Sequence, residues 1–152
     1  MRTLALFALL GAASLAQAER RIAIDVDLRV DAKAQAAVEV ADAFADALAA
    51  GDLDTVKSLL AEDVIVLESG GVEASRDAYF AHHAAADAKY LADATQTITR
   101  RIAKADGATV WIATESTLAK PNQSPSKNTE TLVLAKRKGD WKIVHIHWSS
   151  RD

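Results

Sequence analysis

The sequence contains no cysteine, no cluster of basic residues and, beyond residue 18, no long apolar run. Without cysteine no disulfide can form, so stability must come from one hydrophobic core or from oligomerisation. The 18 Lys and Arg residues are outnumbered by 21 Asp and Glu residues, which argues against a nucleic-acid partner because no basic stripe is present. No downstream run approaches the roughly 20 apolar residues of a membrane-spanning helix, so we expect no membrane partner.

Residues 1–18, MRTLALFALLGAASLAQA, have the pattern of a secretory signal peptide. Arg2 precedes an apolar stretch, and Ala16 and Ala18 flank Gln17 as in an A-x-A cleavage site. We therefore expect cleavage after Ala18 and a periplasmic or secreted protein. The remaining chain of about 134 residues is long enough for one compact domain.

Residues 19–31 are predicted to form an N-terminal strand or arm, because apolar and polar side chains alternate there. The apolar side comprises Ile22, Ile24, Val26, Leu28 and Val30. Three helices are expected next, within residues 32–91. Asp31 is the expected cap of the first, which Gly51 ends. Asp52 and Ser75 are the expected caps of the second and the third, and the third should run to about residue 91.

The segment DVIVLES predicts a buried strand that ends at the turn Gly70-Gly71. Up to four long strands are expected after the third helix, over residues 95–105, 108–119, 129–138 and 141–149. Short turns at Asp106-Gly107 and at KGD predict antiparallel neighbours. The polar loop KPNQSPSKN is expected to form a rim at most. Helices followed by an antiparallel meander predict a single α+β domain over residues 32–152.

This order of elements, with AGDLDTVKSLLAEDVIVLESGG early and GDWKIVHIHWSS late, resembles the nuclear transport factor 2-like (ketosteroid isomerase-like) superfamily. Within it, the chain is similar to the SnoaL-like families, and its ending is similar to the association (hub) domain of calmodulin-dependent kinases. The resemblance covers roughly residues 38–150. It implies a cone-shaped, strongly curved antiparallel sheet wrapped around about three N-terminal helices, with an apolar pocket. Function must still be argued from the site, because the superfamily hosts isomerases, cyclases, dehydratases, hubs and non-catalytic binders.

Glu68 stands, by this resemblance, where ketosteroid isomerases carry their general base. A carboxylate at an apolar strand end is partly desolvated, which raises its pKa toward values useful for removing a proton beside a carbonyl. The same resemblance places Phe44 where those enzymes carry a tyrosine, and losing such a hydrogen-bond donor typically costs about 100-fold or more. The alternative for Glu68 is an acid that faces water or pairs with Arg76 or Arg100.

The four histidines fall into two pairs, which raises a second hypothesis, a metal site. His83 and Asp87 are four residues apart and share a helix face. His145 and His147 are two residues apart and project from one face of a strand. Brought together, these side chains would offer the nitrogen and oxygen ligands that zinc or copper prefers. We otherwise expect no cofactor.

The direction of the last strand argues against the metal hypothesis. Its more apolar side consists of Val144, Ile146 and Trp148. This side should point into the cone, unless a β-bulge changes which side chains face inward. The two strand histidines would then lie on the outer face, where Trp111 is also expected. An exposed tryptophan there favours a homodimer interface formed by Trp111, His145 and His147.

A small-molecule pocket is the third hypothesis. The expected lining is Phe44, Val110, Ile112, Thr114, Leu132, Leu134, Ile146 and Trp148. The alternative is that these side chains simply fill the core. The leading interpretation is an exported protein that binds a small apolar molecule, with acid–base chemistry of an isomerase, cyclase or dehydratase kind if it is an enzyme. Glu68 would then be the base, and His83 or Tyr79 would polarise the substrate. A non-catalytic dimerisation or binding module is the competing class.

Overall fold

The computed structural model describes residues 27–151. The predicted leader and the arm positions Ile22, Ile24 and Val26 lie outside the described residues. In chain order the elements are β1 (Asp27–Val30), a 3-10 turn (Ala32–Ala34), α1 (Gln35–Ala50), α2 (Leu53–Leu59), β2 (Leu60–Glu68), β3 (Gly71–Glu73), α3 (Arg76–His82), α4 (Ala84–Leu91), β4 (Thr95–Asp106), β5 (Thr109–Ala119), β6 (Ser126–Arg137) and β7 (Asp140–Arg151). Within residues 27–151, no helix has the length and apolar character needed to cross a membrane.

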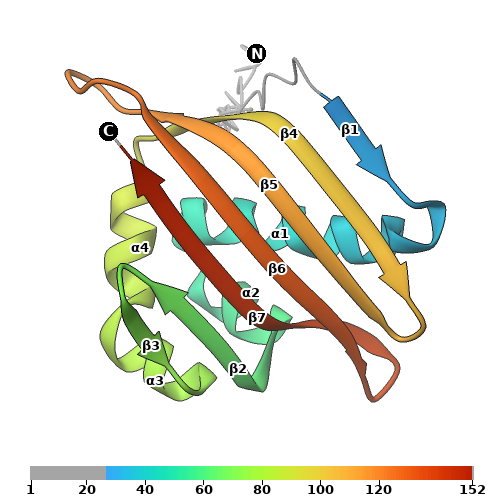
Figure 1. Cartoon of the computed structure of the whole chain (residues 1–152). Helices are drawn as coiled ribbons and strands as arrows, with labels where there is room; N and C mark the ends of the chain where they lie inside the picture. Colours follow the sequence, from blue (N-terminus) through green and yellow to red (C-terminus); the bar gives the residue numbers. More distant parts are fainter. Residues whose placement is uncertain (1–26, 152) are drawn as a thin grey trace, which may run out of the picture.

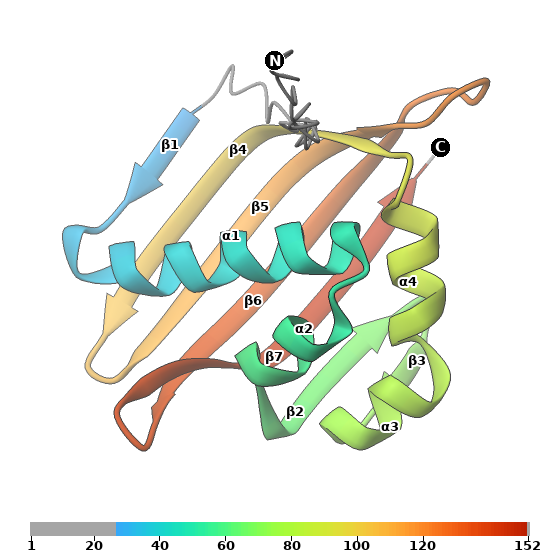
Figure 2. The same ribbon diagram turned by 180° about the vertical axis from the view of Figure 1, so that it is seen from behind.

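The sheet has seven strands in the order β1-β4-β5-β6-β7-β2-β3. It is curved and unclosed, and the helices lie against one of its faces (Figures 1 and 2). The long strands β4 to β7 form the expected antiparallel meander. β1 pairs parallel with β4, and β2 pairs parallel with β7, so the sheet as a whole is mixed. The predicted α+β cone is therefore confirmed, with the short β3 as an unpredicted edge strand.

Two of the three predicted helix caps are formed by side chains. Asp52 Oδ1 accepts a hydrogen bond from the Thr55 N–H at 3.1 Å, and Ser75 Oγ accepts one from the Ala78 N–H at 3.1 Å. Gly51 ends α1 with a φ of 73°, a left-handed conformation that a glycine adopts without strain. These local signals fix the tight hairpin between α1 and α2 and the start of α3.

The prediction that Asp31 caps the first helix is wrong. The Asp31 side chain caps no helix, because its carboxylate accepts hydrogen bonds from Lys104 Nζ at 3.3 Å and from the Ala105 N–H at 3.4 Å. The 3-10 turn precedes α1 instead. Asp31 thus ties the end of β1 to β4, a contact between distant residues that no local sequence pattern predicts.

The predicted third helix is broken at His83 into α3 and α4. His83 has φ −122° and ψ −39°, away from regular helical values. Its Nδ1 lies 2.7 Å from Glu73 Oε1, and Nδ1 of His82 lies 3.1 Å from Glu73 Oε2. One carboxylate on β3 therefore contacts both histidines at the helix junction, and α4 continues in a different direction from α3 (Figure 2).

Side chains on the helix-facing side of the sheet form rows that cross the strands. One of these, the apolar row, consists of successive paired residues that are at most 2% exposed: Val66, Ile146, Leu132, Ile112 and Ala103. Side chains of α1, including Val38, Ala41 and Leu48, belong to the same buried cluster. The core therefore lies where α1 crosses the apolar row.

A β-bulge in β7 changes the predicted side-chain direction at one position. The pairing between β6 and β7 shifts around Val144, so Ile143, at 0% exposure, takes the buried place that Val144 was expected to fill. Beyond the bulge, Ile146 and Trp148 point inward as predicted. The two histidines of this strand consequently point to the opposite face.

We predict that Ile146→Ala lowers the free energy of unfolding by about 2–5 kcal/mol, because it leaves a cavity in the apolar row. Leu28 is the matched control, since it is 48% exposed on β1. Leu28→Ala should cost less than about 1 kcal/mol. Urea denaturation followed by circular dichroism measures both values. Equal losses in the two variants would contradict the location of the core.

Candidate functional site

A second row of paired side chains lies two residues further along the strands from the apolar row. This polar row consists of Glu68, Trp148, Glu130, Thr114 and Arg101, in that order across β2, β7, β6, β5 and β4. Two residues along a strand correspond to about 7 Å. Ionisable and aromatic groups thus begin one step beyond the core.

Trp148 is the second residue of the polar row and contacts side chains of both α1 and α3. Its ring lies 6.3 Å from that of Phe44 at an interplanar angle of 19°, and 6.3 Å from that of Tyr79 at 55°. Its Nε1 donates a hydrogen bond to Glu130 Oε2 at 2.8 Å. Because an indole N–H can only donate, this bond fixes which oxygen of Glu130 acts as acceptor.

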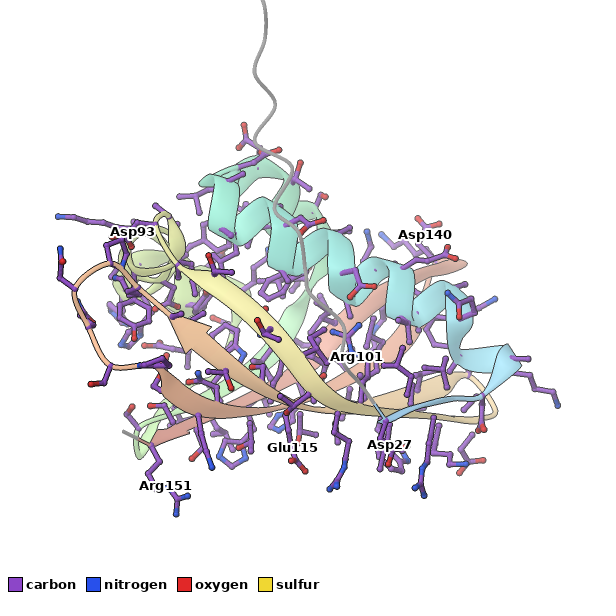
Figure 3. All side chains as sticks on the ribbon, turned by 90° about the horizontal axis from the view of Figure 1, so that it is seen from above. Asp27, Asp93, Arg101, Glu115, Asp140 and Arg151 are labelled. Atoms are coloured by element: carbon purple, nitrogen blue, oxygen red, sulfur yellow. The ribbon has the colours of Figure 1, made fainter. Side chains whose placement is uncertain are left out.

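Arg101 ends the polar row and is paired within the protein. One of its terminal nitrogens donates to Asp42 Oδ1 at 2.6 Å, and its Nε donates to Thr114 Oγ1 at 3.3 Å. Figure 3 shows Arg101 between the helices and the sheet, whereas Asp27 and Glu115 project from the other face. The Arg101–Asp42 pair therefore links α1 to β4 beside the core.

A cavity of about 850 Å³ borders the polar row. Its walls come from the sheet, α1 and α4, and they combine apolar side chains such as Leu48 and Leu118 with Glu68, Asp87 and Glu130. This volume lies within the roughly 300–1,000 Å³ of small-molecule sites. A further row formed by Ser116, Asn128 and Ser150 continues the lining along the strands.

Three carboxyl groups of the lining have raised pKa values, and burial is the main cause for each. The negative charge of Asp87 raises the pKa of Glu68 further. A hydrogen bond from the Tyr79 hydroxyl partly offsets the effect of burial on the pKa of Asp87. The Trp148 N–H does the same for the pKa of Glu130. Acids with raised pKa values suit proton transfer nearer neutral pH than ordinary carboxyl groups do.

Glu68 borders the cavity at the end of β2, as expected for a base that reaches a ligand. It is not paired with either of the arginines weighed as partners. Arg76 lies 3.9 Å from Glu62, and Arg100 lies 3.0 Å from Glu115. Among residues 27–151, the Glu68 carboxyl group has no hydrogen-bond partner. It is therefore available to a ligand.

The two predicted polarising residues, Tyr79 and His83, do not border the cavity. Tyr79 is fully buried, and its hydroxyl donates to Asp87 Oδ2 at 2.9 Å. Burial raises the pKa of Tyr79 well above its ordinary value, so this hydroxyl keeps its proton. His83 lies against Glu73 at the helix junction. Asp87 is the acidic residue of α4 that borders the cavity.

Of the predicted pocket residues, Phe44 and Trp148 border the cavity. The others face inward but are sealed within the protein at 0–3% exposure: Val110, Ile112, Thr114, Leu132, Leu134 and Ile146. The physical reason is that α1 packs directly over the apolar row. The hollow therefore lies one row further along the strands than the apolar pattern indicated.

The structure does not bring the proposed metal ligands together. Asp87 borders the cavity and His83 lies at the helix junction, whereas His145 and His147 lie on the outer face of β7. Over the described range 27–151, no group of three or more His, Asp or Glu side chains could hold a metal ion. The inward direction of Trp148 explains this separation, since neighbouring residues of a strand point to opposite faces.

Glu130 is the main residue of the site that the sequence analysis missed. The sequence did contain an indication of it. Glu130 is two and four residues from Leu132 and Leu134, so all three side chains point to the same face of the strand, and those leucines were expected to point inward. A charged residue at an inward position, two residues from a buried leucine, is uncommon enough to indicate a site.

Trp111 lies on the outer face, as predicted, and is 41% exposed. It pairs across the strands with Val133, which pairs with His145, which in turn pairs with Ile65. Ile65 is 43% exposed. These four residues form a partly apolar outer row on the face that no helix of residues 27–151 covers (Figure 3).

Both the sequence and the fold are similar to those of known proteins. The family model of the SnoaL-like domain matches residues 38–151. A solved structure of a candidate ketosteroid isomerase from Shewanella frigidimarina is 35% identical, with a TM-score of 0.74, and the match covers 80% of this chain and 98% of that one. No curated protein matches the sequence.

Two more distant structures have the same fold. A candidate calcium/calmodulin-dependent protein kinase II association domain from Xanthomonas campestris is 27% identical, with a TM-score of 0.63, over 80% of this chain and 89% of that one. A candidate dehydratase from Streptomyces avermitilis is 18% identical, with a TM-score of 0.65, over 79% of this chain and 96% of that one. Candidate enzymes and a candidate association domain therefore both occur among its structural neighbours.

We predict that Glu130→Gln alters how stability depends on pH. The pKa of Glu130 is raised in the folded protein, so the folded state binds more protons than the unfolded state, and stability falls as pH rises above about 4. The variant cannot ionise at this position. Its Tm, relative to that of the wild type, should therefore increase between pH 4 and 8, as measured by differential scanning fluorimetry. Glu62→Gln, at a 90% exposed side chain, is the control. A constant difference in Tm for Glu130→Gln would contradict the burial of this charge.

Proposed function

The chain belongs to the SnoaL-like domain family, and on that premise we propose that it is an exported protein that binds a small, mostly apolar molecule and moves a proton on it without a cofactor. One observation carries this proposal. A carboxyl group with a raised pKa and no hydrogen-bond partner among residues 27–151, that of Glu68, borders a cavity of about 850 Å³. Export rests on the leader predicted over residues 1–18.

In the proposed reaction, Glu68 removes a proton from a carbon next to a carbonyl group of the ligand. The electron pair left by the broken C–H bond moves to the carbonyl oxygen. Glu130 stabilises that oxygen by donating a hydrogen bond from its neutral carboxyl group. Because Oε2 accepts from Trp148, the proton of neutral Glu130 belongs on Oε1. Return of the proton from Glu68 to another atom of the ligand completes an isomerisation.

Glu130 also resolves a difficulty that Phe44 creates. Phe44 borders the cavity, but its ring cannot donate a hydrogen bond to a developing oxyanion. A neutral carboxyl group can supply that bond in its place. We assign Tyr79 to positioning Asp87, because the Tyr79 hydroxyl donates to Asp87 and does not border the cavity. The similarity to a candidate ketosteroid isomerase supports this class of chemistry.

We predict that the protein accelerates exchange of the α-protons of an apolar ketone, such as 2-tetralone, for deuterium in D₂O. Nuclear magnetic resonance measures this exchange without knowledge of the natural substrate. Glu68→Gln should slow the catalysed exchange by about 100-fold or more, because a positioned base typically contributes that much. Folding should be unaffected, since Gln has the same shape.

The control is Glu62→Gln, which removes a carboxylate of the same strand outside the cavity. It should exchange the ketone at the wild-type rate. Equal exchange by Glu68→Gln and the wild type would remove Glu68 from the mechanism. A wild-type protein that neither binds nor exchanges such ketones would contradict the proposed chemistry.

The outer face favours a second function, assembly into a homodimer. Trp111 and Ile65 are 41% and 43% exposed at the two ends of the outer row, and large exposed apolar side chains on one face often mark an interface. A candidate association domain is among the similar structures. The histidines His145 and His147 would then lie at or beside the contact between subunits. This function is compatible with ligand binding on the opposite face.

We predict that the wild type is a dimer and that Trp111→Glu makes it monomeric, because the change would place two charges in an apolar contact. Size-exclusion chromatography with light scattering measures the mass. Leu28→Glu is the control, since Leu28 is 48% exposed but lies on the edge strand β1. It should leave the dimer intact. A monomeric wild type would rule out the assembly function.

A further inference from the structure

The charged side chains that line the cavity all have the same sign. Four carboxylates border it, and no Lys, Arg or His does so: the acids are Asp46, Glu68, Asp87 and Glu130. They come from different elements, α1, β2, α4 and β6, and therefore surround the space from several walls. A cavity with such a lining disfavours an anionic ligand, because like charges would meet in a partly desolvated space.

The neighbouring basic side chains already contact other acids. Arg101 donates to Asp42 at 2.6 Å. Lys120 Nζ donates to the carbonyl oxygen of Tyr90 at 2.9 Å and lies 3.2 Å from Asp93. His83 Nδ1 lies 2.7 Å from Glu73. None of these groups is placed to neutralise the cavity acids by direct contact.

The cavity acids retain hydrogen-bond acceptors that other protein groups do not use. Glu68 has no hydrogen-bond partner among residues 27–151. Asp87, which is half-buried, uses Oδ2 to accept from Tyr79, and its Oδ1 has no hydrogen-bond partner in the described chain. Acceptors without a protein partner at the wall of a cavity need a donor group from water or from a ligand. A ligand that donates hydrogen bonds supplies one.

We propose that the natural ligand is a cation, a small molecule with an apolar body and a protonated amine, and that Glu68 and Asp87 bind the amine. Glu68 lies on one side of Trp148, and Glu130, on the other side, keeps its proton for the carbonyl oxygen of the ligand. Asp87 faces the same space from α4. An ammonium group donates three hydrogen bonds, which matches acceptors arranged on two walls. The apolar body contacts Phe44 and nearby leucines.

The remaining acid, Asp46, has a separate part in this arrangement. It is exposed on α1 and still borders the cavity. A negative charge at such a place attracts cations toward the opening before they bind. Asp46 should therefore affect the rate of association more than the affinity.

This inference rests on the proposed function, because it identifies the ligand of the same cavity. It also supplies a condition that the proposed reaction needs. A base must be ionised before it can take a proton, and burial raises the pKa of Glu68. A bound cation favours the ionised form of a nearby acid. The ligand would thus help to prepare the base that acts on it.

The experiment compares three probes with one hydrocarbon body: 2-(1-naphthyl)ethylamine, 2-(1-naphthyl)ethanol and 1-naphthylacetate. Isothermal titration calorimetry measures their affinities for the full-length mature protein. The amine should bind at least about 10-fold more tightly than the alcohol, since hydrogen bonds to charged groups contribute about 1.5–3 kcal/mol. The acetate should bind more weakly than either.

Variants then locate the amine. Glu68→Gln and Asp87→Asn should each weaken amine binding about 10-fold while changing alcohol binding by less than about threefold. Glu62→Gln, which alters an acid outside the cavity, should change neither affinity. Titrations at pH 5.5 in buffers of different ionisation enthalpy should show that amine binding releases protons, because the cation promotes ionisation of the cavity acids. The alcohol should release none.

The outcomes separate this inference from the proposed function. Equal binding of the alcohol and the amine, both lost when Ala45→Trp fills the cavity wall, would overturn the cation proposal and leave the binding pocket in place. Tighter binding of the acetate would also overturn it. Failure of all three probes to bind would count against the proposed pocket itself.

Discussion

The contacts of one side chain, Trp148, separate the packed core from the hollow. Its ring lies beside Phe44 of α1 and Tyr79 of α3, so helices from two parts of the chain meet the sheet at this residue. Its N–H binds Glu130, which fixes an interior carboxyl group that would otherwise be free to turn. On one side the apolar row is sealed by α1, and on the other the cavity begins. The orientation of Trp148 therefore sets both the inner limit of the pocket and the chemistry at that limit.

Stability and chemistry occupy neighbouring rows of the same strands. The apolar row is at most 2% exposed and needs no polar partner. The polar row places ionisable groups about 7 Å away, where burial raises the pKa values of Glu68 and Glu130. The Arg101–Asp42 pair, at 2.6 Å, ends the row without neutralising these acids by contact. The packing of the apolar row thus offsets the free-energy cost of partly desolvating the neighbouring acids. Functional sites typically carry such a cost.

Local patterns in the sequence predicted most of the fold. The caps at Asp52 and Ser75, the turns and the period-two strands depend on neighbouring residues, and they agree with the structure. Features that depend on distant residues were not predictable in this way. The helix break at His83 coincides with contacts to Glu73 on β3. The bulge in β4 between Ile98 and Arg100 turns Arg101 inward, against a simple alternation that would place Ile98 and Ile102 on one face. For the site, Trp148 followed from strand direction and Glu68 from the resemblance to ketosteroid isomerases, but the position of the hollow depended on how closely α1 packs on the sheet.

Core contacts and cavity lining lie in separate rows of the same strands. Because the apolar row is packed by α1, a substitution in the polar row changes the lining of the cavity without removing the main core contacts. The same cone can therefore hold an acid at one position in one protein and an arginine or an apolar residue in another. The structural neighbours, which include a candidate isomerase, a candidate dehydratase and a candidate association domain, are consistent with such variation. In this chain the row has one acid on each side of a tryptophan, and the proposed ligand preference rests on that combination rather than on the fold.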